Sequence, residues 1–327
     1  MEGLQMRNKL TEIIKEKLCP IPADQQDPHY RFYYQNYADN LLYPMDPRHQ
    51  REYGEGSGGE LEAKGTRPAK MASIVSSSAM TFNLLGNCQA KIIDNPFFEP
   101  GTYQIAYEKK LPTLNKRSSP ANLDALLYNE EASEAIFCEM KMMEWLGKPG
   151  VLKSAYLDEH NYFNSDSGRV FSRLAETMIG MSTPDQTTDF VSRFERYDAW
   201  QMFKHIVGIY NATSFDVKTQ LEQSTHMESL AGKFKNITLV NVVFELREAL
   251  IEDDKLREKY HCALRQEEDE ACAFTGFIHD TQSGLAQLFK DHCHTQFNVL
   301  YLPVSLFANA FEKSQWEKEY LKRYGCK

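Results

Sequence analysis

The sequence predicts an α/β fold with a mixed central sheet of four to five strands, flanked by helices and extended by large helical and loop insertions. Two observations support this prediction. Residues 122–145 contain two apolar runs of strand length separated by a short polar segment, a pattern typical of a hairpin. The β-branched run at 237–246 is typical of a buried strand, and the long helical segment before it indicates a crossover connection back to the hairpin.

Hydrophobic periodicity gives the remaining elements, because apolar residues recur every three to four positions on a helix and alternate along a half-buried strand. Helices are expected at 7–19, 71–86, 168–180, 187–210 and 305–325, with a mostly helical segment at 245–291. Further strands are expected at 103–110 and 295–304.

Two regions of the chain differ in composition. Residues 1–70 form an N-terminal helix and an extension rich in aromatic and loop-forming residues, whereas residues 71–327 form the main domain, with insertions at 146–186 and 247–291. Interleaved aromatic and basic residues can stack on nucleic-acid bases. Tyrosines in such a stretch more often pack onto the surface of a domain, and we favour that interpretation.

The bulk composition is that of an ordinary globular chain, since 42% of the 327 residues are hydrophobic and 25% are charged. The sequence has no apolar run of about 18 residues, so we expect no transmembrane helix. The charged N-terminus lacks the apolar core of a signal peptide. We therefore expect a cytoplasmic protein whose seven scattered cysteines are reduced. The formal charge of −9 argues against a broad nucleic-acid-coating surface but allows a local basic groove.

Three charged residues interrupt the apolar runs of the hairpin. Asp124 lies at the start of the first run, and Glu139 and Lys141 lie within the second. Residues two apart on a strand point to the same face, so Glu139 and Lys141 share a face and Met140 points to the other. Pairing of the two runs would bring Asp124 near Glu139. Burying such groups is costly unless they are paired or bind a metal, so the pattern indicates a functional site.

Two carboxylates, a main-chain carbonyl and water are the hard oxygen ligands that Mg²⁺ or Mn²⁺ prefers. We therefore predict a metal site made by Asp124, Glu139 and the backbone carbonyl of Met140. A lysine beside such an ion, here Lys141, can orient a water or neutralise charge that develops on a phosphate. This combination supplies the chemistry needed to cut a phosphodiester bond.

The hairpin resembles the PD-(D/E)XK nuclease superfamily, whose core carries Asp, a variable gap and then (Asp/Glu)-x-Lys on the next strand. Here the pattern is Asp124, fourteen residues and Glu139-Met140-Lys141, with Asn-Leu-Asp in place of the nominal Pro-Asp. The resemblance implies a restriction-endonuclease-like core. It also implies that Gln201, on the helix after the hairpin, reaches back towards the metal site or the DNA backbone.

A bacterial subfamily of these nucleases, the PGN_0703-like group, has a similar helix before the hairpin. Its pattern is Ser-Ser-x-Ala-x-x-x-Asn, then an apolar pair and Gly. With approximate spacing it matches Ser77-Ser78-Ala79 through Asn83-Leu84-Leu85-Gly86. This resemblance, which covers roughly residues 71–145 and 187–246 in all, implies substrate contacts for Ser77 and Asn83, with helix packing and capping as the alternative. Many superfamily members carry an acidic ligand on this helix, and this chain has none between Glu62 and Asp94.

Four more polar residues near the proposed site are candidates for substrate contact. Glu108 belongs to the strand expected at 103–110, and the alternative is a solvated edge charge. Lys116 and Arg117 lie in the loop before the hairpin, where phosphate contacts would be useful, and the alternative is a solvated loop. His205 shares a helix face with Gln201, and the alternative is the polar face of a surface helix.

The leading hypothesis is a metal-dependent nuclease, with DNA favoured over RNA as the substrate. Asp124 and Glu139 would hold Mg²⁺ or Mn²⁺. Lys141 would assist water activation, and Gln201 would orient the site. A homodimer is compatible with the sequence, and no membrane partner is expected. One alternative is a catalytically inactive member of the same fold that binds nucleic acid or protein. Another is a metal hydrolase on an unrelated fold, which would place Asp124 and Glu139 far apart.

Overall fold

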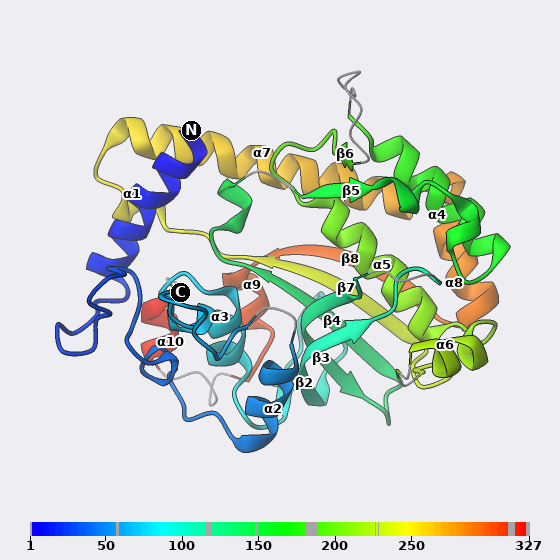
Figure 1. The fold of residues 1–327 in the computed structure, drawn as a ribbon, viewed down its shortest axis with the longest axis horizontal. Coiled ribbons are helices and arrows are strands. Elements are labelled where there is room, and N and C mark those ends of the chain that lie inside the picture. The colour runs from blue at the N-terminus through cyan, green and yellow to red at the C-terminus, as the bar shows by residue number, and fades with distance from the viewer. Residues whose placement is uncertain are drawn as a thin grey trace.

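The computed structural model describes residues 2–56, 59–115, 119–147, 150–180, 189–225, 227, 229–312 and 318–324. Within them, six strands form a curled sheet in the order β1-β2-β3-β4-β7-β8, and two short strands, β5 and β6, form a separate ribbon (Figure 1). The strands are β1 (Ala90–Ile92), β2 (Gly101–Leu111), β3 (Ala121–Asn129), β4 (Glu134–Lys141), β5 (Val151–Lys153), β6 (Asp189–Val191), β7 (Asn236–Val243) and β8 (Gln296–Pro303).

Strands β1 to β4 pair with one another in antiparallel order, whereas β7 lies parallel to β4, and β8 lies parallel to β7. Each of the two parallel neighbours is reached through a helical crossover, as parallel pairing requires. β4 therefore has a hydrogen-bonded neighbour on each side, and all its residues are buried except the last, Lys141, which is half-buried.

The α-helices are α1 (Glu2–Lys17), α2 (Pro47–Glu55), α3 (Ser77–Leu85), α4 (Ser165–Met178), α5 (Ala199–Thr213), α6 (Lys218–Thr225), α7 (Asp254–His279), α8 (Leu285–Cys293), α9 (Val304–Asn309) and α10 (Lys318–Arg323). Short 3₁₀ helices are η1 (Tyr37–Asn40), η2 (Lys70–Ala72), η3 (Glu144–Leu146), η4 (Ser154–Tyr156), η5 (Glu159–Asn161), η6 (Glu248–Leu250) and η7 (Thr281–Ser283).

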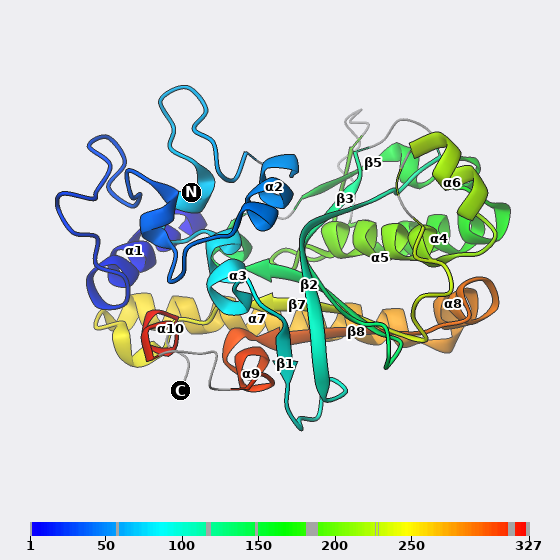
Figure 2. The same cartoon turned by 90° about the horizontal axis from the view of Figure 1, so that it is seen from below.

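Helices cover both faces of the sheet (Figures 1 and 2). On one face, α4, α5, α8 and the C-terminal half of α7 form a hydrophobic cluster with Leu123 and Phe137. On the other face, α3, α9, α10 and the N-terminal helices α1 and α2 form a second cluster with Ala125 and Met140. The polar residues of the hairpin therefore lie between two apolar layers.

The structure confirms the predicted α/β class, but several of its elements differ from the prediction. The sheet has six strands rather than four or five, because the three-residue edge strand β1 is too short for periodicity to reveal. The helix expected at 187–210 is wrong in its first part, because residues 189–191 pair with β5. α5 begins only at Ala199, after the Asp198 side chain accepts a hydrogen bond from the Gln201 N–H and caps the helix.

Two other predicted helices are shorter in the structure. The helix expected at 71–86 begins at Ser77, because the Ser76 side chain accepts the Ala79 N–H and caps it there. The C-terminal helix is divided into α9 and α10, and part of the intervening segment lies outside the described residues. No helix in the described part of the chain combines the length and the apolar character that a membrane span requires.

Candidate functional site

A cleft of about 620 Å³ lies where the end of β4 meets the start of α5. Side chains reach it from β2, β3 and β4, from α1 and from the segment that leads into α3, so the N-terminal region forms the wall opposite the sheet. Its lining includes five carboxylates, Glu60, Glu108, Asp124, Glu139 and Glu144, and four cations, Arg7, Arg67, Lys70 and Lys141. The cleft is therefore rich in charge of both signs.

The Glu139 carboxylate binds three partners. Lys141 Nζ lies 2.8 Å from its Oε1, Gln201 Nε2 donates to the same oxygen at 2.7 Å, and His205 Nε2 lies 2.9 Å from Oε2. Lys141 also donates a hydrogen bond to Gln201 Oε1. Glu139, Lys141 and Gln201 thus form a closed triangle, in which each side chain contacts the other two.

Charge pairing determines the ionisation of this triangle. Burial alone would raise the pKa of Glu139, but Lys141 and then His205 more than offset burial and lower that pKa to about 2. Burial opposes the charge on Lys141, but Glu139 outweighs burial and raises the pKa of the ammonium. Both groups are therefore charged at neutral pH.

The sequence of α5 explains why it contributes two partners. Gln201 and His205 are four residues apart, so they lie above one another on one helix face. The helix also packs closely on the sheet, since a Cβ added at Gly208 would lie 2.8 Å from the Cβ of Leu111. His205 is buried beside Glu139 and is not among the residues that line the cleft.

Asp124 joins the site from the neighbouring strand. Its Oδ2 accepts the Met140 N–H at 2.6 Å, which ties it to the residue between Glu139 and Lys141. The alternation of β3 breaks here, because Leu123 and Ala125 pack in opposite core clusters although residues two apart on a regular strand share a face. Burial, then the charges of Glu139 and Glu108, raises the pKa of Asp124 well above its ordinary value.

Glu108 lies on β2 at the level of Asp124, between the cross-strand pairs Tyr107–Ala125 and Lys109–Leu123. Its φ is 50°, in the left-handed region where a non-glycine residue is strained. Such strain often accompanies functional sites, because the surrounding structure must enforce it. The irregular backbone of the two strands therefore coincides with two of the cleft carboxylates.

Neighbouring groups fix the Glu108 side chain. Asn122 Nδ2 donates a hydrogen bond to its carboxylate. Gly56 lies so close that an added Cβ would be 2.8 Å from Glu108 Oε2. Burial, then the charges of Glu60 and Glu139, raises the pKa of Glu108 to about 7 although the bond from Asn122 opposes the shift. Burial, with repulsion from neighbouring carboxylates, thus favours protonation of Glu108.

Glu60 and Lys70, which no sequence pattern revealed, also face the cleft. Glu60 Oε2 accepts a hydrogen bond from Ser78 Oγ at 2.7 Å, and its Oε1 lies 3.1 Å from Lys70 Nζ. Glu60 therefore brings a carboxylate to α3, a helix that carries none of its own. Periodicity could not reveal this contact, because Glu60 belongs to an irregular segment.

The remaining predicted contact residues are dispersed. Ser77 lines the cleft at the start of α3. Asn83, on the same helix, is fully buried away from it and bonds to the Asn40 carbonyl, the Leu42 N–H and the Tyr324 hydroxyl. Asn83 thus joins N- and C-terminal segments of the chain. Lys116 and Arg117 lie outside the described residues.

The donor set of the cleft suits a hard cation. Carboxylates at Glu108, Asp124 and Glu139 supply oxygen ligands, and a cation would relieve the repulsion that raises the pKa of the first two. Among the described residues, no three His, Cys, Asp or Glu side chains are already grouped as a metal-binding set. Mg²⁺ commonly takes one or two protein carboxylates and keeps several waters, so these residues fit it without a preformed cage.

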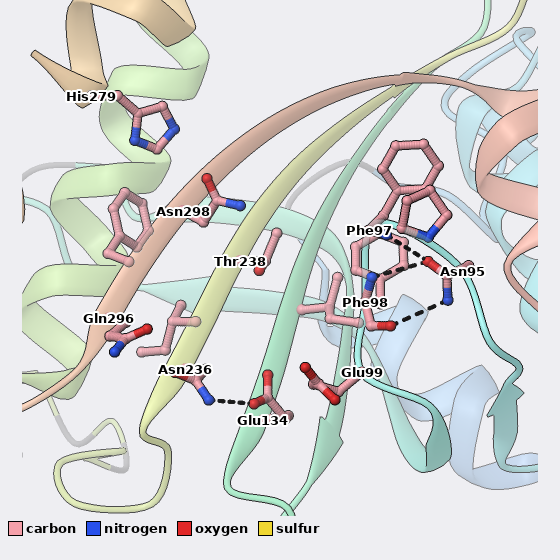
Figure 3. A pocket seen from close by; sticks show the side chains of 14 residues that line it. Asn95, Phe97, Phe98, Glu99, Glu134, Asn236, Thr238, His279, Gln296 and Asn298 are labelled. Carbon is pink, nitrogen blue, oxygen red and sulfur yellow. Dashed lines mark hydrogen bonds between the residues drawn. The ribbon is translucent and has the colours of Figure 1, made fainter.

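A second cavity, of about 500 Å³, lies at the opposite end of β4 (Figure 3). Its floor is a ladder of polar side chains in register across three strands, with Glu134, Asn236 and Gln296 on one rung and Thr238 and Asn298 on the next. Asn236 donates a hydrogen bond to Glu134. We call this region the polar groove.

The chain was compared with known families, curated proteins and solved structures. The model of a family described as "REase-ARP: Restriction Endonuclease associating with ARP" matches residues 7–266, which are 260 of the 327 residues. The matched segment contains every cleft residue named above. No curated protein and no solved structure matches the chain.

Proposed function

The chain belongs to the REase-ARP family, and from this premise we propose that it is a metal-dependent nuclease with a PD-(D/E)XK core and DNA as its substrate. One observation carries the proposal. Asp124 on β3 and the Glu139–Lys141 pair on β4 lie on one wall of the cleft, joined through the Met140 N–H and through Gln201. An unrelated fold that keeps Asp124 and Glu139 apart is therefore not supported.

Each residue of the wall has a distinct role in the proposed reaction. Asp124 and Glu139, with Glu108 and the Met140 carbonyl, would hold Mg²⁺ or Mn²⁺. The bound ion would polarise the phosphate and lower the pKa of a water. Lys141 keeps its charge beside Glu139, so it can orient the attacking water and offset negative charge on the phosphate. Gln201 holds the side chains of Glu139 and Lys141 in place through a hydrogen bond to each.

The opposite wall supports a phosphate-bearing substrate. Arg7, Arg67 and Lys70 line it, and such cations bind the nucleic-acid backbone without reading its sequence. Ser77 also lines the cleft, so the N-terminus of α3 faces it, and the dipole of a helix attracts anions at that end.

Metal binding and cleavage test the proposal together. Millimolar Mn²⁺ should raise the Tm of the wild type and leave that of an Asp124→Asn/Glu139→Gln variant unchanged. With Mg²⁺ the wild type should cleave plasmid DNA, and single-stranded RNA serves as the competing substrate. Full metal-dependent cleavage by Asp124→Asn would show that its assigned role is wrong. A folded wild type that binds DNA and neither binds Mn²⁺ nor cleaves would instead be an inactive binding protein.

A further inference from the structure

A chamber of about 100 Å³ is lined by Lys141 and Gln201, which are hydrogen-bonded to each other. It shares Lys141, Glu144 and Gln201 with the cleft. Its other lining comes from η3, from the segment before α5, from β7 and from α7. Lys141, Glu144 and Gln201 therefore border a second polar space besides the cleft.

Four residues that line the chamber carry a buried polar atom with no hydrogen-bond partner in the described part of the chain. These atoms are Trp145 Nε1, Tyr197 OH, Asn241 Oδ1 and Glu267 Oε2. Each of the four residues is at most 4% exposed. Buried polar atoms in native proteins are nearly always hydrogen-bonded, so four of them around one cavity indicate a polar occupant.

Water fits this chamber. The occupant must accept a hydrogen bond from Trp145 and donate one to Asn241 Oδ1, because Asn241 Nδ2 already donates to the Glu139 carbonyl at 3.5 Å. A volume of about 100 Å³ corresponds to roughly three waters at about 30 Å³ each, whereas a benzene ring occupies a cavity of about 150 Å³ in a well-studied case. Lys141 and Gln201, which are hydrogen-bonded to each other, line both the chamber and the cleft.

We propose that ordered water in this chamber links Lys141 and Gln201 to Glu267, and that Glu267 is a positioning residue for the cleavage reaction. While Glu267 is neutral, the Lys141 ammonium stays with Glu139. An ionised Glu267 competes for that ammonium through the water and loosens the triangle. The catalytic consequence rests on the proposed function, whereas the link between Glu267 and Lys141 rests on the chamber alone.

The charges around Glu267 favour its neutral form at pH 7. Burial, then Glu270 on the same helix and Asp198 before α5, raises the pKa of Glu267 to about 8, and Lys141 and Arg196 oppose the shift. The other titratable groups that face this region are Glu144 of η3, Tyr197 before α5 and Tyr301 of β8. Burial raises the pKa of both tyrosines far above 8, so they stay neutral where Glu267 ionises.

The pH profile of DNA cleavage tests the positioning role. From pH 7 to pH 9 the kcat of the wild type should fall about tenfold, since one pH unit above a pKa leaves about a tenth of the group neutral. Glu267→Gln cannot ionise, so its kcat should stay level over that range. Asp269→Asn changes an exposed carboxylate on the same helix and should keep the wild-type profile. An unchanged alkaline fall in Glu267→Gln would overturn the positioning role.

A double-mutant cycle on stability tests the link without any need for activity. Glu267→Gln, Lys141→Met and the double variant are melted at pH 7 and pH 9. At pH 9 the two changes should be non-additive by about 2 °C in Tm, and at pH 7 they should be closer to additive. Additivity at both pH values overturns the proposal, whether or not the protein cleaves DNA. Non-additivity at pH 9 in a wild type that cleaves nothing supports the link and rejects the proposed nuclease function.

Discussion

Strand β4 carries a glutamate at each end, and the two carboxylates ionise in opposite ways. Glu139, at the cleft, contacts Lys141 and His205, and its pKa is lowered to about 2. Glu134, in the polar groove, accepts one hydrogen bond from Asn236, and burial together with the charge of Glu99 raises its pKa. One strand thus presents one carboxylate whose pKa is lowered and another whose pKa is raised.

The difference shows that neighbouring charge, rather than burial, shifts the pKa values of Glu139 and Glu134 in opposite directions. Glu139 is 3% exposed and Glu134 is 8% exposed, so both are desolvated. The cleft includes four Lys and Arg side chains, whereas the described lining of the polar groove holds Glu99 and Glu134 without a Lys or Arg. The groove has no Lys or Arg to attract a phosphate and the cleft has four, so this difference supports the proposal that phosphodiester chemistry belongs to the cleft.

The largest expected effect is on the rate of DNA cleavage when Glu139 or Glu134, near the two ends of β4, is replaced. Glu139→Gln removes the ion pair with Lys141 and a proposed metal ligand, so kcat should fall on the order of 1,000-fold, equivalent to about 4 kcal/mol. Glu134→Gln keeps the shape of the side chain in the polar groove and should leave kcat within about twofold. Plasmid cleavage under matched Mg²⁺ concentrations measures both, and equal losses in the two variants would contradict the assignment.

The next effect is on the pH dependence of stability, which should have opposite signs at the two ends. The folded-state pKa of Glu139 lies below its ordinary value of 4.5, so its ionisation stabilises the fold above that pH, by about 3 kcal/mol, and this is lost as pH falls towards about 2. The pKa of Glu134 is raised, so its contribution is present below pH 4.5 and is lost as pH rises through the folded-state pKa.

Urea denaturation between pH 3 and pH 7 measures these contributions. The stability advantage of the wild type over Glu139→Gln should shrink as pH falls. The stability of Glu134→Gln relative to the wild type should instead improve as pH rises. If both variants changed in the same direction, neighbouring charge would not be the cause of the difference.

The sequence was sufficient for the part of the site that follows strand and helix geometry. Glu139 and Lys141 are two residues apart on one strand, and Gln201 and His205 are four residues apart on one helix, so periodicity alone placed each pair on one face. Gln201 donates a hydrogen bond to Glu139 in the structure, but the expectation that it reaches back towards this site came from the family resemblance and not from periodicity. The same patterns located the main strands β2, β3, β4, β7 and β8 along the chain.

The rest of the site depends on contacts that periodicity does not describe. Glu60 meets Ser78 across an irregular segment, and Glu267 reaches the chamber from α7, far along the chain. The alternation of β2 and β3 breaks at Glu108 and Asp124, whereas a pattern argument assumes that strands stay regular. Tertiary packing enforces these conformations, so no local signal could reveal them.

The smallest expected effect is the difference in stability between substitutions at a strained position and at a regular position of β2. Glu108 has a positive φ, so Glu108→Gly should be more stable than Glu108→Ala by about 1 kcal/mol, because only glycine adopts that conformation without a steric cost. At Ala106, on the same strand, φ is not positive, and Ala106→Gly should be destabilising by roughly 0.5–1 kcal/mol. Urea denaturation at pH 7 measures all three variants. Equal stabilities of Glu108→Gly and Glu108→Ala would show that the backbone there is relaxed. Both changes at Glu108 should also reduce Mn²⁺ binding. That result would mean that the strained backbone serves to hold the carboxylate in the cleft.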